Sequence, residues 1–290
     1  MSTYMIGDVQ GCFESLLSLL ETMDVQAGDR ICLVGDLVNR GPRSLDVLNW
    51  AMKRDDQVQI VLGNHDLHLI ACHYGAEQER GDTLQSTLEA ENAEDIITWL
   101  RHQPLLWEAE IEGQRIAMVH AGINPKWSWD EVRARSKKVE ESLRSKTGGE
   151  RLAAVHPKRK AHLSRPQVPE PWLEDLGWLT RVRAIDREHQ PDWGFKGALS
   201  ELPDELTPWF VHYEQLRDPM TTPDHLYFGH WAALGLRVST SYTALDSGCI
   251  WGRYLSAVRV EDGAIFQVPT IEEGLTPKNQ RYTNSERVGV

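Results

Sequence analysis

Three short stretches in the first quarter of the chain decide its fold: TYMIGDVQGC (residues 3–12), ICLVGDLVNRG (31–41) and QIVLGNHD (59–66). Each contains an apolar, strand-forming run followed by glycine together with Asp, Asn or His. Apolar residues at helical spacing fill 13–23 and 45–52 between these stretches. The order strand–helix–strand–helix–strand predicts a sheet whose first strands are parallel.

The polar residues that follow these strands are expected to meet. The carboxyl ends of parallel strands share one edge of a sheet, which brings Asp8, Asp36 and Asn64 together. His120 and His230 each follow a further apolar strand and add imidazole groups. Taken singly, such residues are more often turn formers, helix caps or ordinary histidines. Together, this mixture of carboxylate, amide and imidazole suits Mn²⁺, Mg²⁺ or Fe²⁺ and predicts a metal or phosphate site.

The remaining chain predicts a second group of strands and a different middle. A hairpin is expected from 105–111 and 115–119, after a helix capped by Asn92 that runs to Arg101. Residues 127–223 are rich in charge, proline and tryptophan, and begin with a helix over 128–144. Further strands are expected at 225–228, 235–240, 241–245, 253–261 and 264–268.

These patterns predict an α/β fold, a sandwich of two mixed sheets with helices outside. We expect one domain over 1–271, with 127–223 as a cap-like insertion of helices and loops, and a flexible tail over 272–290. Seven tryptophans lie in or beside the insertion, and we expect most to pack and a minority to contact an adenine ring. They are Trp127, Trp129, Trp172, Trp178, Trp193, Trp209 and Trp231.

Composition narrows the class of protein. The four cysteines are far apart in the 290 residues, which argues against a disulfide scaffold or zinc ribbon and fits a reducing compartment. No apolar run approaches the ~18 residues of a membrane span. We therefore expect a cytoplasmic protein, with a monomer favoured. The net charge of −12 argues against a dedicated nucleic-acid binder.

The stretch 133–165 reverses this charge, with eleven Lys or Arg against three Glu. Two interpretations stay open at this point. The stretch is a solvated helix face and loop, or it is a patch for a polyanionic ligand, with Lys158, Arg159 and Lys160 at its centre.

The strand-end clusters resemble the calcineurin-like metallophosphoesterases, in the branch of the phosphoprotein phosphatases. Gly7-Asp8-Val9-Gln10-Gly11, Gly35-Asp36 through Arg40-Gly41 and Gly63-Asn64-His65-Asp66 follow that pattern, with His120 and His230 as the later histidines. The strings at 179–183, 228–231 and 245–252 are similar to those of the bacterial diadenosine tetraphosphatases within this family. The resemblance runs from about residue 3 to 268.

The resemblance implies a dinuclear hydrolase that cleaves diadenosine tetraphosphate symmetrically to two ADP with a metal-activated hydroxide, and extends to capped RNA 5′ ends. Two divalent ions are implied, Mn²⁺ first, with Co²⁺, Fe²⁺ or Mg²⁺ as alternatives. Asp36 would bridge them; Asp8 and position 10 would complete one site, and Asn64, His120 and His230 the other. His65 would protonate the leaving group, with Asp66 setting its tautomer. Arg40, Arg183 and, with less support, Arg181 would bind phosphate oxygens.

Position 10 departs from the family pattern, because Gln10 replaces the histidine of the first motif. A glutamine oxygen is a weaker donor than an imidazole nitrogen. Coordination by the carbonyl, a water between Gln10 and the ion, or low occupancy would each follow, and we favour a weakened but functional site.

Two rival functions remain. A Ser/Thr protein phosphatase would share the metal motifs, but that branch has an arginine before the glycine of the third motif, where this chain has Leu62. A non-catalytic nucleotide- or metal-binding module would follow if the first site had decayed at Gln10.

Overall fold

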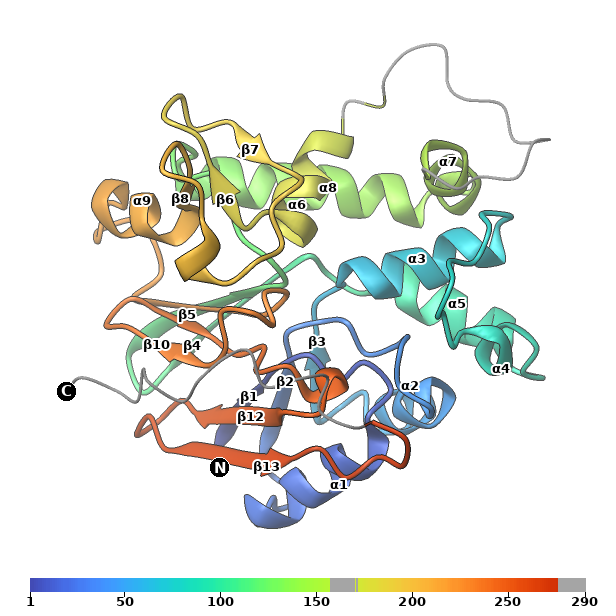
Figure 1. Cartoon of the computed structure of the whole chain (residues 1–290). Helices are drawn as coiled ribbons and strands as arrows, with labels where there is room; N and C mark the ends of the chain where they lie inside the picture. Colours follow the sequence, from blue (N-terminus) through green and yellow to red (C-terminus); the bar gives the residue numbers. More distant parts are fainter. Residues whose placement is uncertain (157–169, 171, 276–290) are drawn as a thin grey trace.

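The structure is a computed structural model that describes residues 1–156, 170 and 172–275. Two five-stranded sheets lie face to face, and a separate layer of helices and short strands covers one end of them (Figure 1). The mixed α/β sandwich expected from the sequence is confirmed.

The first sheet carries the three strands that open the chain. Its order is β13-β12-β1-β2-β3, and the parallel pairing expected for β1, β2 and β3 is confirmed, with Met5 opposite Cys32 and Cys32 opposite Gln59. β12 and β13 add an antiparallel edge. The strands span Thr3–Ile6 (β1), Arg30–Leu33 (β2), Val58–Ile60 (β3), Tyr254–Arg259 (β12) and Ile265–Pro269 (β13).

The second sheet has the order β10-β11-β9-β5-β4 and is also mixed. The expected hairpin forms from β4 and β5, and its turn residues Glu112 and Gly113 have φ of 52° and 79°. The expected strand at 235–240 shortens to two residues. The strands span Leu106–Ile111 (β4), Gln114–Val119 (β5), His225–Phe228 (β9), Arg237–Val238 (β10) and Tyr242–Ala244 (β11).

Alternation along the strands explains why the sheets pack face to face. In β1, Met5 contributes to the core between the sheets, whereas Tyr4 and Ile6 contribute to the larger core beneath the helices. β5 divides in the same way, with Met118 between the sheets and Val119 on the helical side. Because successive side chains point to opposite faces, β1 and β5 each supply both cores.

Five helices lie in the part of the chain before β4, and two of them, α3 and α4, were not expected. They are α1 (Phe13–Thr22), α2 (Ser44–Met52), α3 (Asn64–His73), α4 (Gln85–Leu88) and α5 (Ala93–His102). The apolar pattern does not predict α3, because the first turn of this helix is polar and contains Asn64 and His65. Asn92 does precede α5, but its amide donates to Asn49 instead of capping the helix.

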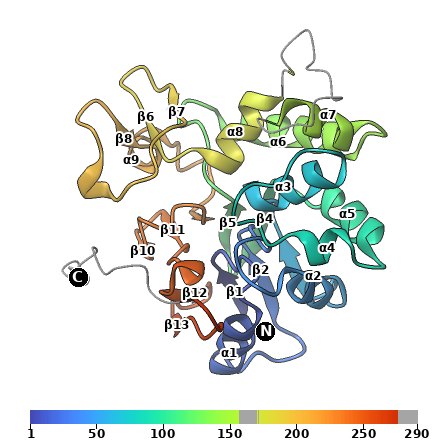
Figure 2. The ribbon, with the colours of Figure 1, turned by 45° about the vertical axis from the view of Figure 1, so that its right-hand side comes forward.

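The described residues of 127–223, here called the cap segment, form the layer above the sheets (Figures 1 and 2). Besides the expected α6, they contain a three-stranded sheet of order β7-β6-β8 that the sequence did not predict. The elements are α6 (Trp129–Arg144), α7 (Gly148–Val155), α8 (Leu173–Arg181), β6 (Ala184–Ile185), β7 (Pro191–Asp192), η1 (Leu199–Glu201), β8 (Thr207–Pro208) and α9 (Trp209–Leu216).

Most cap tryptophans pack, as expected. Trp129, Trp172, Trp178, Trp209 and Trp231 are buried, and Trp127 stacks edge-on against Trp178.

The described arginines of the basic stretch make ion pairs: Arg133 with Glu108, Arg135 with Asp175 and Arg151 with Glu170. That pairing favours the solvated-face interpretation for this part of the stretch. Lys158, Arg159 and Lys160 lie outside the described residues.

The start of the expected tail is anchored, which differs from the prediction. Glu272 is buried and accepts hydrogen bonds from the backbone N–H and the hydroxyl of Ser15. Residues 276–290 lie outside the described part of the chain. Within that part, no helix has the length and apolar character needed to cross a membrane.

Candidate metal centre and the cavity around it

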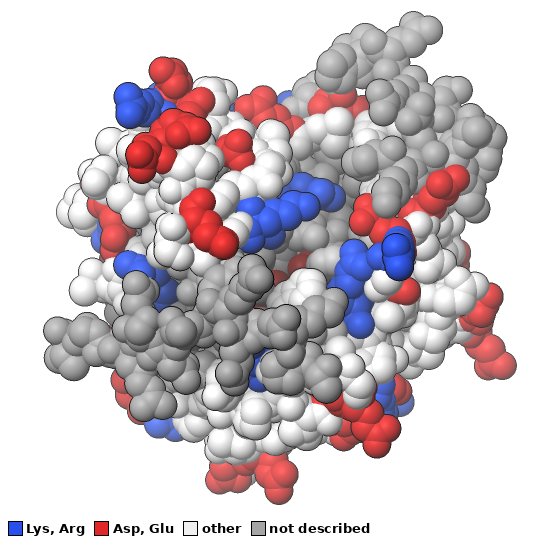
Figure 3. All heavy atoms as spheres, viewed as in Figure 1, with Lys and Arg blue, Asp and Glu red and all other residues white. Residues whose placement is uncertain are grey.

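A cavity of about 1100 Å³ lies between the cap segment and the sheets. One wall, here called the core wall, includes Gln10, Arg40, Asn64, His65 and Trp251; the opposite cap wall includes Gly177, Arg181, Arg183, Trp193 and Lys196. Figure 3 shows a hollow on this face, with basic side chains on two of its sides. The cavity therefore opens where the carboxyl ends of the first strands meet, as expected for ligand sites in such sheets.

Three buried side chains form the centre of the site. One ligand atom each from Asp36, His120 and His230 lies within 4.8 Å of the others. The residues come from the loop after β2, the end of β5 and the end of β9, so both sheets contribute. Burial lowers the pKa of both histidines and keeps the imidazoles neutral, which is the form that binds a metal.

Backbone carbonyls orient both imidazoles. His120 Nδ1 lies 2.7 Å from the carbonyl of Val34, and His230 Nε2 lies 3.0 Å from the carbonyl of Arg181. Because a carbonyl only accepts, each of these ring nitrogens carries the proton. The lone pairs of His120 Nε2 and His230 Nδ1 are therefore left for the centre, an arrangement that metal-binding histidines share.

The amide of Asn64 indicates what these lone pairs surround. Its end lies 2.7 Å from His230 Nδ1 and 3.3 Å from His120 Nε2. An amide oxygen facing two ring lone pairs is repulsive unless a cation lies among them; without one, the amide turns and its nitrogen donates. The donor set thus fits a divalent ion.

Glycine lets two carboxylates come close to the neighbouring loops. A Cβ at position 229 would lie 2.0 Å from Asp8 Oδ1, and one at position 63 would lie 2.2 Å from Asp36 Oδ1. The backbone N–H of His230 donates to both oxygens of Asp8 at 3.1 Å. Asp8 is therefore attached to the β9 loop, next to the centre formed by Asp36.

Asp246 is a site residue that the sequence interpretation did not assign. It is buried and lies two residues after the end of β11. Burial raises the pKa of Asp8, and the charges of Asp246 and Asp36 raise it further. The pKa of Asp246 itself rises to about 7, through burial and then Asp36. A signal was present, since an acidic residue follows an apolar strand and a glycine comes two residues later. Crowded buried carboxylates of this kind are stabilised by a divalent cation.

Gln10 lies beside Asp36 but presents its nitrogen, since Nε2 is 3.4 Å from Asp36 Oδ2. Its backbone adopts a φ of 47°, held by a hydrogen bond from its N–H to the carbonyl of Asp36. A half-turn of the amide would direct Oε1 at the same place. Position 10 therefore reaches the centre, and its role as a ligand stays a prediction.

His65 has a different partner from the one expected. Asn39 Nδ2 lies 3.0 Å from His65 Nδ1, while Asn39 Oδ1 accepts from the backbone N–H of Arg40 and of Thr83. These two acceptor contacts fix the amide orientation, so Nδ1 of His65 accepts and Nε2 carries the proton. That Nε2 lies 4.0 Å from Asp36 Oδ2.

Asp66 occupies a structural position instead. Its two oxygens accept from the backbone N–H groups of Asp36, Leu37 and Gly63. It therefore joins the loop after β2 to the start of α3, because the helix turns its side chain back toward both loops.

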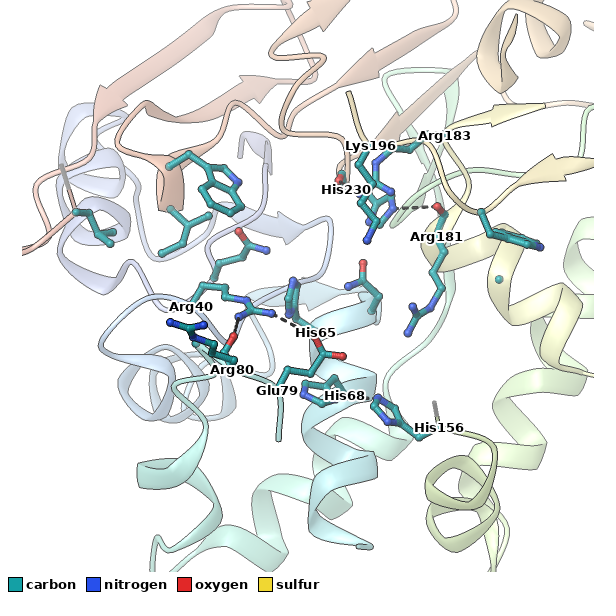
Figure 4. A pocket seen from close by; sticks show the side chains of 18 of the residues that line it. Arg40, His65, His68, Glu79, Arg80, His156, Arg181, Arg183, Lys196 and His230 are labelled. Carbon is teal, nitrogen blue, oxygen red and sulfur yellow. Dashed lines mark hydrogen bonds and ion pairs between the residues drawn. The ribbon is translucent and has the colours of Figure 1, made fainter. Parts of the chain in front are cut away.

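Asp82 connects the His65 contact to the rest of the core wall. Its carboxylate is buried and accepts from Asn39 Nδ2 at 2.9 Å and interacts with His68 Nε2 at 2.7 Å. Arg40 Nη2 lies 3.5 Å away. His68 in turn lies 3.0 Å from His156 at the end of α7 (Figure 4). One carboxylate thus supports both the amide that orients His65 and a basic side chain of the cavity.

Basic side chains approach the centre from both walls (Figure 4). Arg181, Arg183 and Lys196 come from the cap wall, and Arg40 and Arg80 from the core wall. Arg183 also donates to the carbonyl of His230 at 3.3 Å, which places it beside the centre. Guanidinium groups in this arrangement match the oxygens of a polyphosphate.

Position 62 does not reach this cavity. Leu62 is fully buried in the larger core. In the described part of the chain, the basic residues that line the cavity come instead from the cap wall and from Arg40 and Arg80 of the core wall.

Comparison with known proteins identifies a family and similar sequences. The pattern of the family described as "Calcineurin-like phosphoesterase" matches residues 1–232. A protein of Nitrosomonas europaea named symmetrical bis(5′-nucleosyl)-tetraphosphatase is 40% identical, covering 93% of this chain and 99% of that protein. A protein of Chromobacterium violaceum with the same name is 38% identical, covering 93% and 95%.

The fold has counterparts among solved structures. A crystal structure described provisionally as a diadenosine tetraphosphatase overlays with a TM-score of 0.58 at 24% identity, covering 92% of this chain and 93% of the other. At this identity the likeness supports the fold alone.

Proposed function

This chain belongs to the calcineurin-like phosphoesterase family, and we propose that it is a metal-dependent hydrolase that cleaves diadenosine tetraphosphate symmetrically into two ADP. The observation that carries the proposal is the buried centre in which Asp36, His120 and His230 converge, at the floor of a cavity lined with basic residues. The names of relatives that match almost end to end supply the substrate.

The proposed ligands are the residues that surround the centre. Two divalent ions, with Mn²⁺ preferred over Co²⁺, Fe²⁺ or Mg²⁺, would be held by Asp8, Gln10, Asp36, Asn64, His120 and His230, with Asp36 shared. Such ions supply Lewis-acid charge to phosphate oxygens and increase the acidity of water. Asp246 increases the negative charge around Asp8 and so favours a cation there.

The basic side chains orient the polyphosphate. Arg183 is held beside the centre by its contact with His230, and Arg40 is held on the opposite wall by Asp82. The two side chains bind phosphate oxygens on either side of the central anhydride and offset the repulsion expected from an acidic protein. Arg181 binds an outer phosphate from the cap wall.

His65 acts at the leaving group. Water adds to one central phosphorus and gives a proton to the solvent, and the bridging P–O bond breaks while the departing ADP oxygen accepts a hydrogen bond from Nε2–H of the neutral His65 ring. Asn39 keeps that proton on Nε2 because its amide donates to Nδ1. Asn39 is neutral, so it orients the ring without stabilising an imidazolium in the way a carboxylate would.

The proposal extends to related dinucleoside polyphosphates and to RNA whose 5′ end bears a nucleotide cap, because a cap that resembles a dinucleoside polyphosphate offers the same anhydride. The enzyme would act as a cytoplasmic monomer.

The test is the product pattern with Mn²⁺. Chromatography should show two ADP formed per diadenosine tetraphosphate, and a capped oligonucleotide should lose its cap. ATP plus AMP would indicate asymmetric cleavage and overturn the proposal. Turnover of a phosphoserine peptide alone would favour the protein phosphatase, and nucleotide binding without turnover would favour the non-catalytic module.

The same assay tests position 10. Gln10→His restores an imidazole at the first site, so we expect Mn²⁺ to activate the variant at ~10-fold lower concentration. An unchanged Mn²⁺ titration would show that Gln10 is not a ligand. Calorimetric titration of Mn²⁺ provides the direct measurement.

A further inference from the structure

Two tryptophans differ from all the others in the chain. Trp193 is 46% exposed and Trp251 is 47% exposed, and both line the cavity. Trp129, Trp172 and Trp178 are buried by comparison. An indole left open inside a ligand cavity loses the stabilisation that burial would give, so its exposure points to a ligand.

On the cap wall, Trp193 packs against Trp178 and α8. Its ring meets Trp178 edge-on, with centroids 6.4 Å apart and planes at 73°. A Cβ at position 177 would lie 2.8 Å from Trp193 Cη2, so the glycine in α8 is what lets the indole approach the helix. Asp192 accepts from the N–H groups of Gly194 and Phe195 and shapes the loop that carries the ring.

The core wall holds Trp251 in a tight turn. Trp251 ends the short helix η2 (Cys249–Trp251), between Gly248 with φ of 76° and Gly252 with φ of 78°. Asp246 accepts from the N–H of Gly248 at 3.1 Å. The turn that presents the indole is therefore attached to a carboxylate next to the metal centre.

Each indole stands near basic side chains of its own wall. Lys196 follows Trp193 by three residues and lines the same cavity, while Arg40 and Arg80 line the core wall with Trp251. A cavity of about 1100 Å³ exceeds the usual volume of sites for small ligands, ~300–1000 Å³. Its size and its two aromatic surfaces suit an elongated anion with an aromatic group at each end.

We propose that Trp193 and Trp251 are the nucleobase platforms of the substrate, one for each base of a dinucleoside polyphosphate. The inference rests on the proposed function and adds the means by which bases are bound. Stacking on an indole accepts any base, because every base has a π face. The platforms therefore select a substrate with two bases, while the arginines bind the phosphates between them.

The experiment compares W193A and W251A on three substrates: diadenosine tetraphosphate with two bases, adenosine 5′-tetraphosphate with one, and tripolyphosphate with none. We expect each variant to raise KM for the two-base substrate ~10-fold, with kcat nearly unchanged, and the double variant to combine both effects. KM for the one-base substrate should respond to one of the two variants, and the base-free substrate to neither.

Two controls keep the test decisive. Tyr254→Ala removes an aromatic ring that is 50% exposed and does not line the cavity, so its KM should match wild type. W193F and W251F keep a stacking face and should recover most of the affinity, which a folding defect would not allow.

An unchanged KM for diadenosine tetraphosphate in W193A and W251A, or equal losses on tripolyphosphate, would overturn the platforms. The proposed function fails separately, when wild type does not cleave diadenosine tetraphosphate. In that case binding of a non-hydrolysed dinucleotide, measured by calorimetry, still decides the platforms: weaker binding to W193A and W251A supports them, and equal binding overturns them.

Discussion

The two walls of the cavity are built in different ways. On the core wall, backbone atoms hold the polar groups of the centre: the carbonyl of Val34 orients His120, and Gly63 and Gly229 admit the carboxylates. On the cap wall, long side chains such as Arg181 and Lys196 reach across from an added layer. Buried side chains with a fixed orientation suit the catalytic step, whereas long side chains that extend into the cavity suit the recognition of the substrate.

The largest effect should come from the centre of the core wall. Asp36→Asn removes the shared carboxylate, and we expect hydrolysis to fall by ~10³-fold or more. Asn tolerates the φ of 50° at this position. The charge of Asp36 raises the pKa of Asp8 and Asp246, so its removal should leave the metal-free protein at least as stable.

Thermal unfolding with and without Mn²⁺ checks this separation. Wild type should gain Tm with Mn²⁺ and the variant should not. A variant that is destabilised without metal, or that keeps the Mn²⁺ response, would contradict it.

The contact between Asn39 and His65 should matter next. Asn39→Ala removes the donor to His65 Nδ1 and the acceptor for the N–H groups of Arg40 and Thr83. We expect kcat for an alkyl phosphate ester to fall ~10²-fold, and less for the anhydride, because ADP leaves readily without a proton. His65→Ala should show the same order of effects, and equal losses on both substrates would count against a role for His65 at the leaving group.

A smaller effect is expected from the cap wall. Arg183→Gln removes a cation beside the centre, and kcat/KM for diadenosine tetraphosphate should fall ~10-fold, with a weaker salt dependence. Arg187→Gln is the matched control, since Arg187 is exposed on the same segment and does not line the cavity. Similar kinetics for the two variants would show that the cap wall does not bind phosphate.

The smallest effect concerns stability away from both walls. Burial, together with Arg217, lowers the pKa of His225 to about 4, below the ~6.5 of an unfolded histidine. The unfolded state therefore binds a proton more readily, and the free energy of unfolding falls as pH drops from 6.5 toward 4. His225→Gln should remove about 1–2 kcal/mol of this loss between pH 7 and pH 5.

The measurement is urea unfolding at the two pH values. His102→Gln, which removes an exposed histidine, provides the comparison. A His225 variant with the wild-type pH dependence would contradict the assignment.

The sequence predicted the core wall more completely than the cap wall. Asp8, Asp36, Asn64, His120 and His230 were recognisable because each follows an apolar run, and parallel strands must end at one edge. The cap segment has no comparable periodicity, and its short strands β6, β7 and β8 contain two residues each. Strands so short leave no alternating pattern to detect.

Contacts between distant side chains account for what the sequence could not determine. Asp66 and Asn39 both lie in the predicted motifs, yet only the start of α3 decides that Asp66 turns to the backbone and Asn39 faces His65. Asp82 lies more than forty residues after its partner Asn39, and Asp246 lies more than two hundred residues after Asp8. Each becomes a site residue only when the fold brings its loop to that partner.

By itself, then, the amino-acid sequence predicted the parallel pairing of the first three strands, the polar residues that follow the strands and the family, because these follow from local patterns that the backbone must obey. Only the tertiary structure decided which partner orients His65, that Leu62 is buried, and that two indoles face the cavity. Those features depend on where each side chain points in space. The spacing of residues along the chain does not determine this, because the orientation is set only when the layers pack together.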